Sequence, residues 1–178
     1  MKQTFTHFAL MLAAITMMAS CDFIDIDDRH EARTLDGTWT GYIDTYYADR
    51  WGISGESYRT TIYFERDNAY GGWGYEVDYD SNSRYDDYYY CEFDWEVSGG
   101  IIRIRYADSW DDVYISDYSL SSTRFTGYMD DSTSRDIYFQ LSYDSRFDWT
   151  FWTTRGLTRS TDGEQPRWKA SGKFAQRR

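Results

Sequence analysis

The sequence contains very few of the residues on which most catalytic sites depend. Its 178 residues include only two cysteines, two histidines and one proline. His30 is the one histidine after the first seven residues, so a serine or cysteine nucleophile would depend on that side chain for activation. We therefore expect neither Ser–His nor Cys–His catalysis.

Basic residues are scarce over most of the chain. The whole sequence has 19 Lys and Arg against 30 Asp and Glu, and residues 21–154 hold 11 of the former and 28 of the latter. Such acidity argues against nucleic acid as a partner, because binding it requires neutralised phosphates. Residues 155–178 differ, with seven basic and two acidic side chains. We predict a basic disordered tail there. The alternative is an anionic-surface contact through Arg167, Lys169, Lys173, Arg177 and Arg178.

No apolar run is long enough for a membrane-spanning helix, which needs about 20 residues. The apolar stretch from about Phe8 to Met18 instead fits a secretory signal. It ends at Ala19-Ser20-Cys21, and acidic residues follow at once. We predict a signal peptide over 1–20, an acidic tether over 21–33 and lipidation of Cys21.

Ala19-Ser20-Cys21 resembles the lipobox of bacterial lipoproteins, and the acidic stretch after it resembles the surface-export signal of Bacteroidetes-type bacteria. The resemblance implies an outer-membrane lipoprotein anchored through acyl chains on Cys21. It would be exposed at the cell surface, or alternatively face the periplasm. An ordinary signal peptide with an incidental cysteine is the other interpretation. Since lipidation occupies Cys21, Cys91 has no disulfide partner, and we expect it to be a small buried side chain.

Aromatic residues form 20% of the chain, and apolar residues alternate with polar ones with a period of two, which is typical of strands. No segment after the signal shows a sustained helical period. A ninth strand over Phe147–Trp152 is a further possibility. The eight candidate strands are Thr38–Tyr46, Ser57–Arg66, Gly72–Tyr79, Tyr89–Ser98, Ile101–Tyr106, Asp112–Leu120, Arg124–Met129 and Asp136–Tyr143.

The pair Gly99-Gly100 lies between two alternating runs, as in a two-residue hairpin turn. That turn places Ser98 opposite Ile101, and both faces of the hairpin agree on the register. The remaining predicted pairs are Val97 with Ile102, Glu96 with Arg103, Trp95 with Ile104, Asp94 with Arg105 and Phe93 with Tyr106.

Eight short strands predict an all-β domain over 34–154, either an antiparallel up-and-down barrel or a β-sandwich. Leu35-Asp36-Gly37-Thr38-Trp39 resembles the Gly-x-Trp signature that opens lipocalins, and Ser116-Asp117-Tyr118 is similar to their second motif. The closest resemblance is to lipocalin-like lipoproteins of the Bacteroidetes type. It implies a barrel that is plugged at one end by Gly37 and Trp39.

A barrel of eight strands is wide enough only for its own side chains or one small ligand. Large aromatic side chains favour a filled lumen over a cavity for a small apolar ligand. Trp73, Tyr75, Phe93 and Trp95 are the residues expected to line the lumen or meet such a ligand. The full predicted inward set is Trp39, Ile43, Ile62, Phe64, Trp73, Tyr75, Phe93, Trp95, Ile102, Ile104, Phe139 and Leu141.

Three other groups of residues suggest sites. Outward tyrosines beside carboxylates could stack on sugar rings. These tyrosines are Tyr42, Tyr46, Tyr63 and Tyr138.

A second group has oxygen-bearing residues at alternating positions, which resemble the start of a calcium loop but lack its Gly and Glu. We therefore expect a polar loop there. The residues are Asp78, Asp80, Asn82 and Asp86. Three carboxylates share one strand face, although arginines oppose two of them; they are Glu92, Asp94 and Glu96.

Together these observations predict a lipid-anchored, non-catalytic binding or scaffold protein without a cofactor. A glycan-binding accessory protein is the first alternative. A carboxylate-dependent hydrolase is the second. The sequence does not define the oligomeric state.

Overall fold

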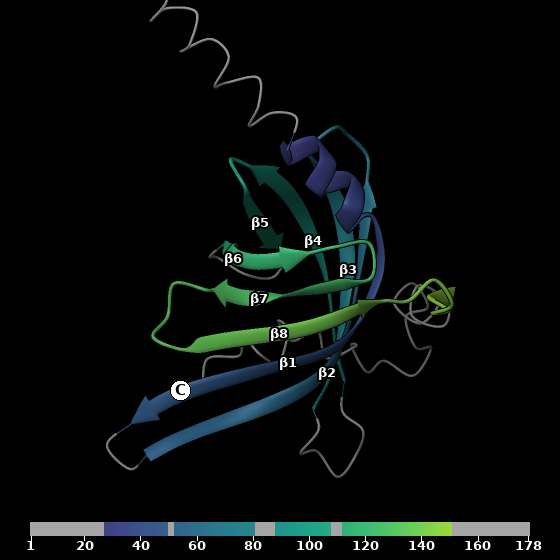
Figure 1. The fold of residues 1–178 in the computed structure, drawn as a ribbon. Helices are drawn as coiled ribbons and strands as arrows, with labels where there is room; N and C mark the ends of the chain where they lie inside the picture. Colours follow the sequence, from purple (N-terminus) through teal and green to yellow (C-terminus); the bar gives the residue numbers. More distant parts are fainter. Residues whose placement is uncertain (1–26, 50–51, 81–87, 108–111, 151–178) are drawn as a thin grey trace, which may run out of the picture.

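Eight antiparallel strands close into one barrel, and each strand pairs with its neighbours in chain order (Figure 1). This computed structural model describes residues 27–49, 52–80, 88–107 and 112–150. The predicted all-β barrel is confirmed, and the sandwich is not formed. The signal peptide, Cys21 and the basic tail lie outside the described residues. The strands are β1 Gly37–Asp49, β2 Gly52–Arg66, β3 Gly71–Asp80, β4 Tyr88–Ser98, β5 Ile101–Tyr106, β6 Val113–Leu120, β7 Arg124–Asp130 and β8 Asp136–Tyr143.

The number of paired residues differs widely between adjacent strands of the barrel. β1 and β2 are matched over thirteen pairs, from Gly37–Phe64 to Asp49–Gly52. β5 and β6 are matched over three, from Ile102–Ile115 to Ile104–Val113. β6 also shifts register against β7 between Tyr114 and Asp117. The β5–β6 seam is therefore the shortest junction of the described wall.

The hairpin between β4 and β5 has the predicted register, with Ser98 opposite Ile101. Gly99 and Gly100 have φ angles of 62° and 73°, which is the positive-φ geometry expected for a two-residue turn. The other five pairs also match the prediction, from Val97–Ile102 to Phe93–Tyr106.

Ten of the twelve residues predicted to face the lumen are buried in the barrel core. They are Trp39, Ile43, Ile62, Phe64, Phe93, Trp95, Ile102, Ile104, Phe139 and Leu141. Cys91 is also buried, as expected. The prediction is wrong for Trp73 and Tyr75, which lie on the outer face of β3.

Glycine on the inner face explains why the β3 aromatics point outward. Register pairs Phe64 with Gly74, so Gly74 shares the inner face with that buried ring. A Cβ on Gly74 would lie 2.1 Å from the backbone oxygen of Tyr63 and 2.4 Å from Cζ of Phe93. Inside the barrel, Phe93 fills the space that a side chain at position 74 would need. The alternate positions, Trp73 and Tyr75, consequently face out.

Residues 27–35 form a helix at one end of the barrel, whereas 27–33 were predicted to belong to a tether. Asp28, Ala32 and Leu35 are buried, and their spacing places them on one helical face. Two of these three residues are apolar, so the periodic signal is short and easily missed. We call this end of the barrel the helix end and the opposite end the far end.

Residues 147–150 do not form the suggested ninth strand. Instead, Trp149 folds back toward β1, and its Nε1 donates a hydrogen bond of 2.9 Å to Oγ1 of Thr38. Within the described ranges, no helix has both the length and the hydropathy to cross a membrane.

Candidate functional site

The helix end of the barrel is closed by packed side chains. Trp39 is fully buried, and its Nε1 donates a 2.7 Å hydrogen bond to the backbone oxygen of Leu35. Its indole meets Phe125 and Tyr143 edge-on, with ring centroids 5.9 and 5.4 Å away. Gly37, with a φ of 122°, lies against the Tyr143 ring. The residues predicted to form a plug therefore lie where a plug would act.

Toward the far end, the interior becomes polar. Glu76 and Asp78 are both fully buried on the inner face of β3. Thr60 donates a 2.7 Å hydrogen bond to Oδ1 of Asp78, and the Tyr106 hydroxyl donates to Oε2 of Glu76. Burial, with the nearby Cys91 thiol and Asp78 carboxylate, raises the pKa of Tyr106 well above its usual value. Tyr106 thus keeps its proton, and this half of the lumen is a poor environment for an apolar ligand.

The outer face of β2–β4 carries a cluster of aromatic rings, which we call the outer aromatic cluster. The rings of Tyr63 and Tyr75 are stacked at an interplanar angle of 16°, and those of Tyr75 and Tyr90 at 27°. Trp149 leans over Tyr63 and Tyr75, with centroids 5.9 and 6.1 Å away. Trp73 meets Tyr75 edge-on at 5.1 Å and remains 37% exposed. The cluster comprises Tyr63, Trp73, Tyr75, Tyr90 and Trp149.

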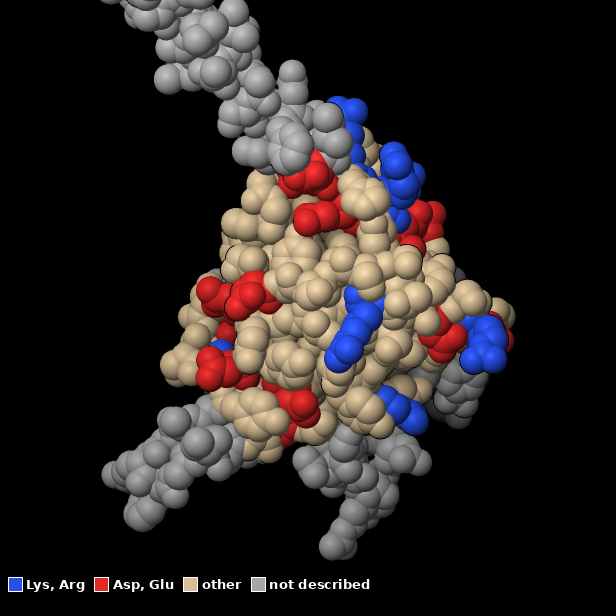
Figure 2. Space-filling model, viewed as in Figure 1, with Lys and Arg blue, Asp and Glu red and all other residues tan. Residues whose placement is uncertain are grey.

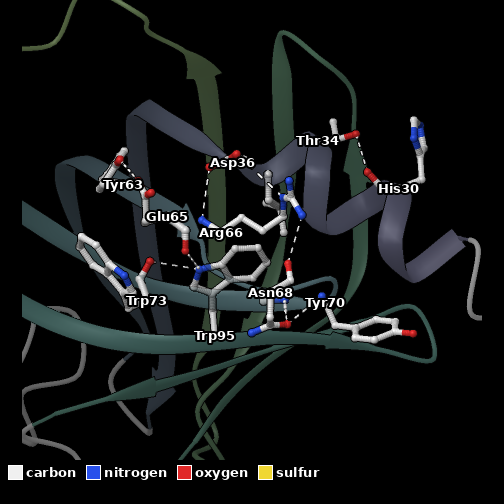
Figure 3. Close-up of polar contacts among 12 residues, drawn as sticks. His30, Thr34, Asp36, Tyr63, Glu65, Arg66, Asn68, Tyr70, Trp73 and Trp95 are labelled. Carbon is white, nitrogen blue, oxygen red and sulfur yellow. Dashed lines mark hydrogen bonds and ion pairs between the residues drawn. The ribbon is translucent and has the colours of Figure 1, made fainter.

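Carboxylates flank these rings on the neighbouring strands. Cross-strand register places Trp73 between Glu65 and Asp94, and Tyr75 next to Glu92. The Tyr63 hydroxyl donates to Oε2 of Glu65 (Figure 3). Burial, followed by this hydrogen bond, raises the pKa of Tyr63 to about 12.

Burial also raises the pKa of Tyr75, with Glu92 and Glu65 adding to the effect. The same causes, burial first and then the Glu92 charge, raise the pKa of Tyr90. These tyrosines therefore remain neutral hydrogen-bonding groups at physiological pH.

A shallow cleft of about 230 Å³ lies next to Trp73, toward the helix end. The β2–β3 turn forms one wall, where the Asn68 side chain accepts hydrogen bonds from the amides of Tyr70 and Gly71. Figure 3 shows Trp95 beside this turn, with its Nε1 directed at the backbone oxygens of Glu65 and Trp73. The charged lining is Asp67, Asp94, Glu96, Arg103 and Arg105.

Three of the four tyrosines predicted to form one sugar platform share an outer face: Tyr138 lies opposite Asp44, between the register positions of Tyr42 and Tyr46. Tyr63 belongs to the outer aromatic cluster, whereas Tyr138 packs on Tyr128 at 5.2 Å. Tyr42 and Tyr46 are on β1 and are 55% and 45% exposed. Tyr128 lines a second surface cleft of about 310 Å³. Of the four tyrosines, only Tyr63 belongs to the outer aromatic cluster.

The predicted acidic ladder is only partly paired as expected. Arg103 forms an ion pair with Glu96 at 2.6 Å, as expected. The Arg105 guanidinium instead forms its ion pair with Asp112, at 3.1 Å, rather than with Asp94. Glu92 and Asp94 are exposed.

Of the four residues that resemble the start of a calcium loop, the structure describes the side chain of Asp78 alone. Asp78 is inside the barrel, the side chain of Asp80 is not described, and Asn82 and Asp86 lie outside the described residues. Among the side chains that the structure describes, no three His, Cys, Asp or Glu residues are placed to hold a metal ion. His30 is exposed on the helix.

Comparisons with known proteins give no relative: no family model, no curated protein and no solved structure matches the chain.

Proposed function

We propose that this protein is a lipid-anchored, non-catalytic binding module whose outer face takes a neutral carbohydrate. The observation that carries the proposal is the position of Trp73, an exposed indole between two carboxylates and beside a polar cleft. Anchoring through Cys21 comes from the lipobox resemblance.

The chemistry of the cluster suits sugar rings. The face of an aromatic ring is electron-rich, and the C–H groups of a sugar carry partial positive charge, so the two attract when stacked. Glu65 and Asp94 can accept hydrogen bonds from sugar hydroxyls at the edge of the same indole. An anionic sugar would meet these carboxylates with like charge, which disfavours binding.

The polar cleft next to Trp73 also favours a neutral sugar. Sugar hydroxyls both donate and accept hydrogen bonds, and the cleft offers the donors Arg103 and Arg105 beside the acceptors Asp94 and Glu96. The two guanidinium groups disfavour a cationic ligand that the aromatic rings alone could attract. The lumen is a less suitable site, because its helix end is packed and its far end is polar.

Calorimetric titration of the acyl-free protein tests the proposal. The probes are a neutral glucan oligosaccharide, a neutral mannan oligosaccharide and an oligogalacturonate. At least one neutral sugar should bind, the acidic sugar should bind more weakly, and Trp73→Ala should weaken binding about tenfold or more, equivalent to about 1.4 kcal/mol.

Tyr128→Ala is the matched control, since Tyr128 is 51% exposed on the other surface cleft. That variant should bind as the unmodified protein does. Equal affinity of the Trp73→Ala variant, or no binding of either neutral sugar at millimolar concentration, would rule the proposal out.

A further inference from the structure

The N-terminal helix is fixed to the barrel by contacts with several different strands. The carboxylate of Asp28 accepts 2.8 Å hydrogen bonds from the backbone amides of both Gly99 and Gly100. The Tyr118 hydroxyl donates to Oε2 of Glu31 at 2.5 Å. Ala32 is fully buried in the same core as the strands. The beginning of the helix therefore has one defined position, at the helix end of the barrel (Figure 1).

Little chain separates this helix from the predicted acyl site. Residues 22–26 lie between Cys21 and the helix, and a chain of that length spans at most about 22 Å in any conformation. β1 has thirteen residues. At about 3.3 Å per residue and a tilt near 40°, the barrel is roughly 30 Å tall. The segment between Cys21 and the helix is therefore shorter than the barrel is tall. If the far end contacted the membrane, the acyl chains on Cys21 could not reach it.

The side chains at the helix end suit a lipid headgroup layer. Exposed arginines lie on the helix, at the start of β7 and after β8: Arg29, Arg33, Arg124 and Arg146. Figure 2 shows basic side chains at this end of the molecule, beside acidic ones. Ile101, 41% exposed, adds an apolar side chain next to the hairpin turn. Exposed acidic side chains lie at the same end, among them Asp27, Asp36 and Asp67. The arginines are attracted by anionic lipids and offset the repulsion of these carboxylates.

We infer that the barrel stands on the membrane with its helix end against the lipid headgroups and its far end directed away. This inference rests on the lipid anchor of the proposed function and goes beyond it. It makes the far-end turns, rather than the hairpin at Gly99-Gly100, the most distant part from the membrane. The outer aromatic cluster then lies on the side wall, with the adjoining cleft and its β2–β3 turn on the side nearer the membrane.

The experiment uses the acylated full chain in vesicles of phosphatidylethanolamine and phosphatidylglycerol that carry a headgroup quencher. A fluorophore is attached at Ser122→Cys, in the exposed β6–β7 turn at the helix end, or at Ser134→Cys, in the exposed β7–β8 turn at the far end. Quenching should be several-fold stronger at position 122. The unsubstituted protein controls for labelling of the buried Cys91.

Flotation of the same samples separates the anchor from the orientation. Protein that floats with the vesicles but is quenched equally at both positions, or more strongly at 134, overturns the inferred orientation and leaves the anchor intact. Protein that does not float contradicts the anchor and the orientation together. Insertion of twenty Gly and Ser residues after Ile26 should reduce the difference in quenching between positions 122 and 134. The longer tether would let either end of the barrel approach the membrane.

Discussion

Asp28 and Gly100 lie 72 residues apart in the sequence and are joined by a 2.8 Å hydrogen bond from the Gly100 amide to Oδ1 of Asp28. Oδ2 accepts an equal bond from Gly99. A single buried carboxylate thus caps the turn of one hairpin and holds the helix on the barrel. The contact explains why both turn residues present their amides toward the helix.

Asp28→Ala should lower the free energy of unfolding by about 2–3 kcal/mol, because hydrogen bonds to a charged group contribute about 1.5–3 kcal/mol. Urea denaturation followed by tryptophan fluorescence measures the change. Asp27→Ala is the control, since Asp27 is exposed on the same helix and should alter stability by less than about 0.5 kcal/mol. Equal effects of the two substitutions would contradict the capping role of Asp28.

Gly74→Ala should destabilise the barrel by about 1–3 kcal/mol or more, since a Cβ there would overlap the Tyr63 backbone and the Phe93 ring. Thermal unfolding monitored by circular dichroism gives the measurement. Ser119→Ala, at an exposed position of β6, should leave the midpoint nearly unchanged. A Gly74→Ala protein as stable as the original would mean that Phe93 does not occupy this space.

Tyr106→Phe removes the hydroxyl that donates to buried Glu76. Loss of a hydrogen bond to a buried carboxylate should cost about 1–3 kcal/mol of stability. The control is Tyr128→Phe, at an exposed tyrosine on the outside of β7. Urea denaturation of both variants should show a lower midpoint for the Tyr106 variant alone, and an unchanged midpoint for it would exclude a stabilising role for the interior hydrogen bond.

Alkaline pH should weaken the fold through the tyrosines. The pKa of Tyr63 rises from 10.0 to about 12 on folding, so the folded protein holds this proton more tightly than the unfolded chain. Stability from this group is complete below about pH 10 and is lost as pH rises toward 12. The urea midpoint should be lower at pH 11 than at pH 8. The Tyr63→Phe substitution should make this difference smaller. A midpoint independent of pH across this range would refute the assignment.

Much of the barrel was predictable because each strand carries a clear period of two. The β4–β5 register followed from Gly99-Gly100 and from opposite charges on one face. The face of β3 was not predictable, since alternation separates two faces without saying which is inside. Its aromatic face resembles a core, and only the tertiary contact of Phe93 with Gly74 reverses the choice. The helix was missed because three buried positions over nine residues give little periodic signal.

The candidate site was predictable only in kind. Sequence analysis expected tyrosines beside carboxylates on an outer face and included Tyr63. It could not place Trp73 there without the correct β3 orientation. Nor could it bring Trp149 onto the same face, because that contact depends on how the chain leaves β8.

The short β5–β6 seam makes opening of the barrel uneven. Regions with few paired residues open at lower free energy than their surroundings. Ile102, Arg103 and Ile104 are the β5 residues matched to β6 there, whereas thirteen pairs hold β1 to β2. Transient breathing should therefore admit water between β5 and β6 first. Amide protons of this seam would exchange with solvent while those between β1 and β2 remain protected.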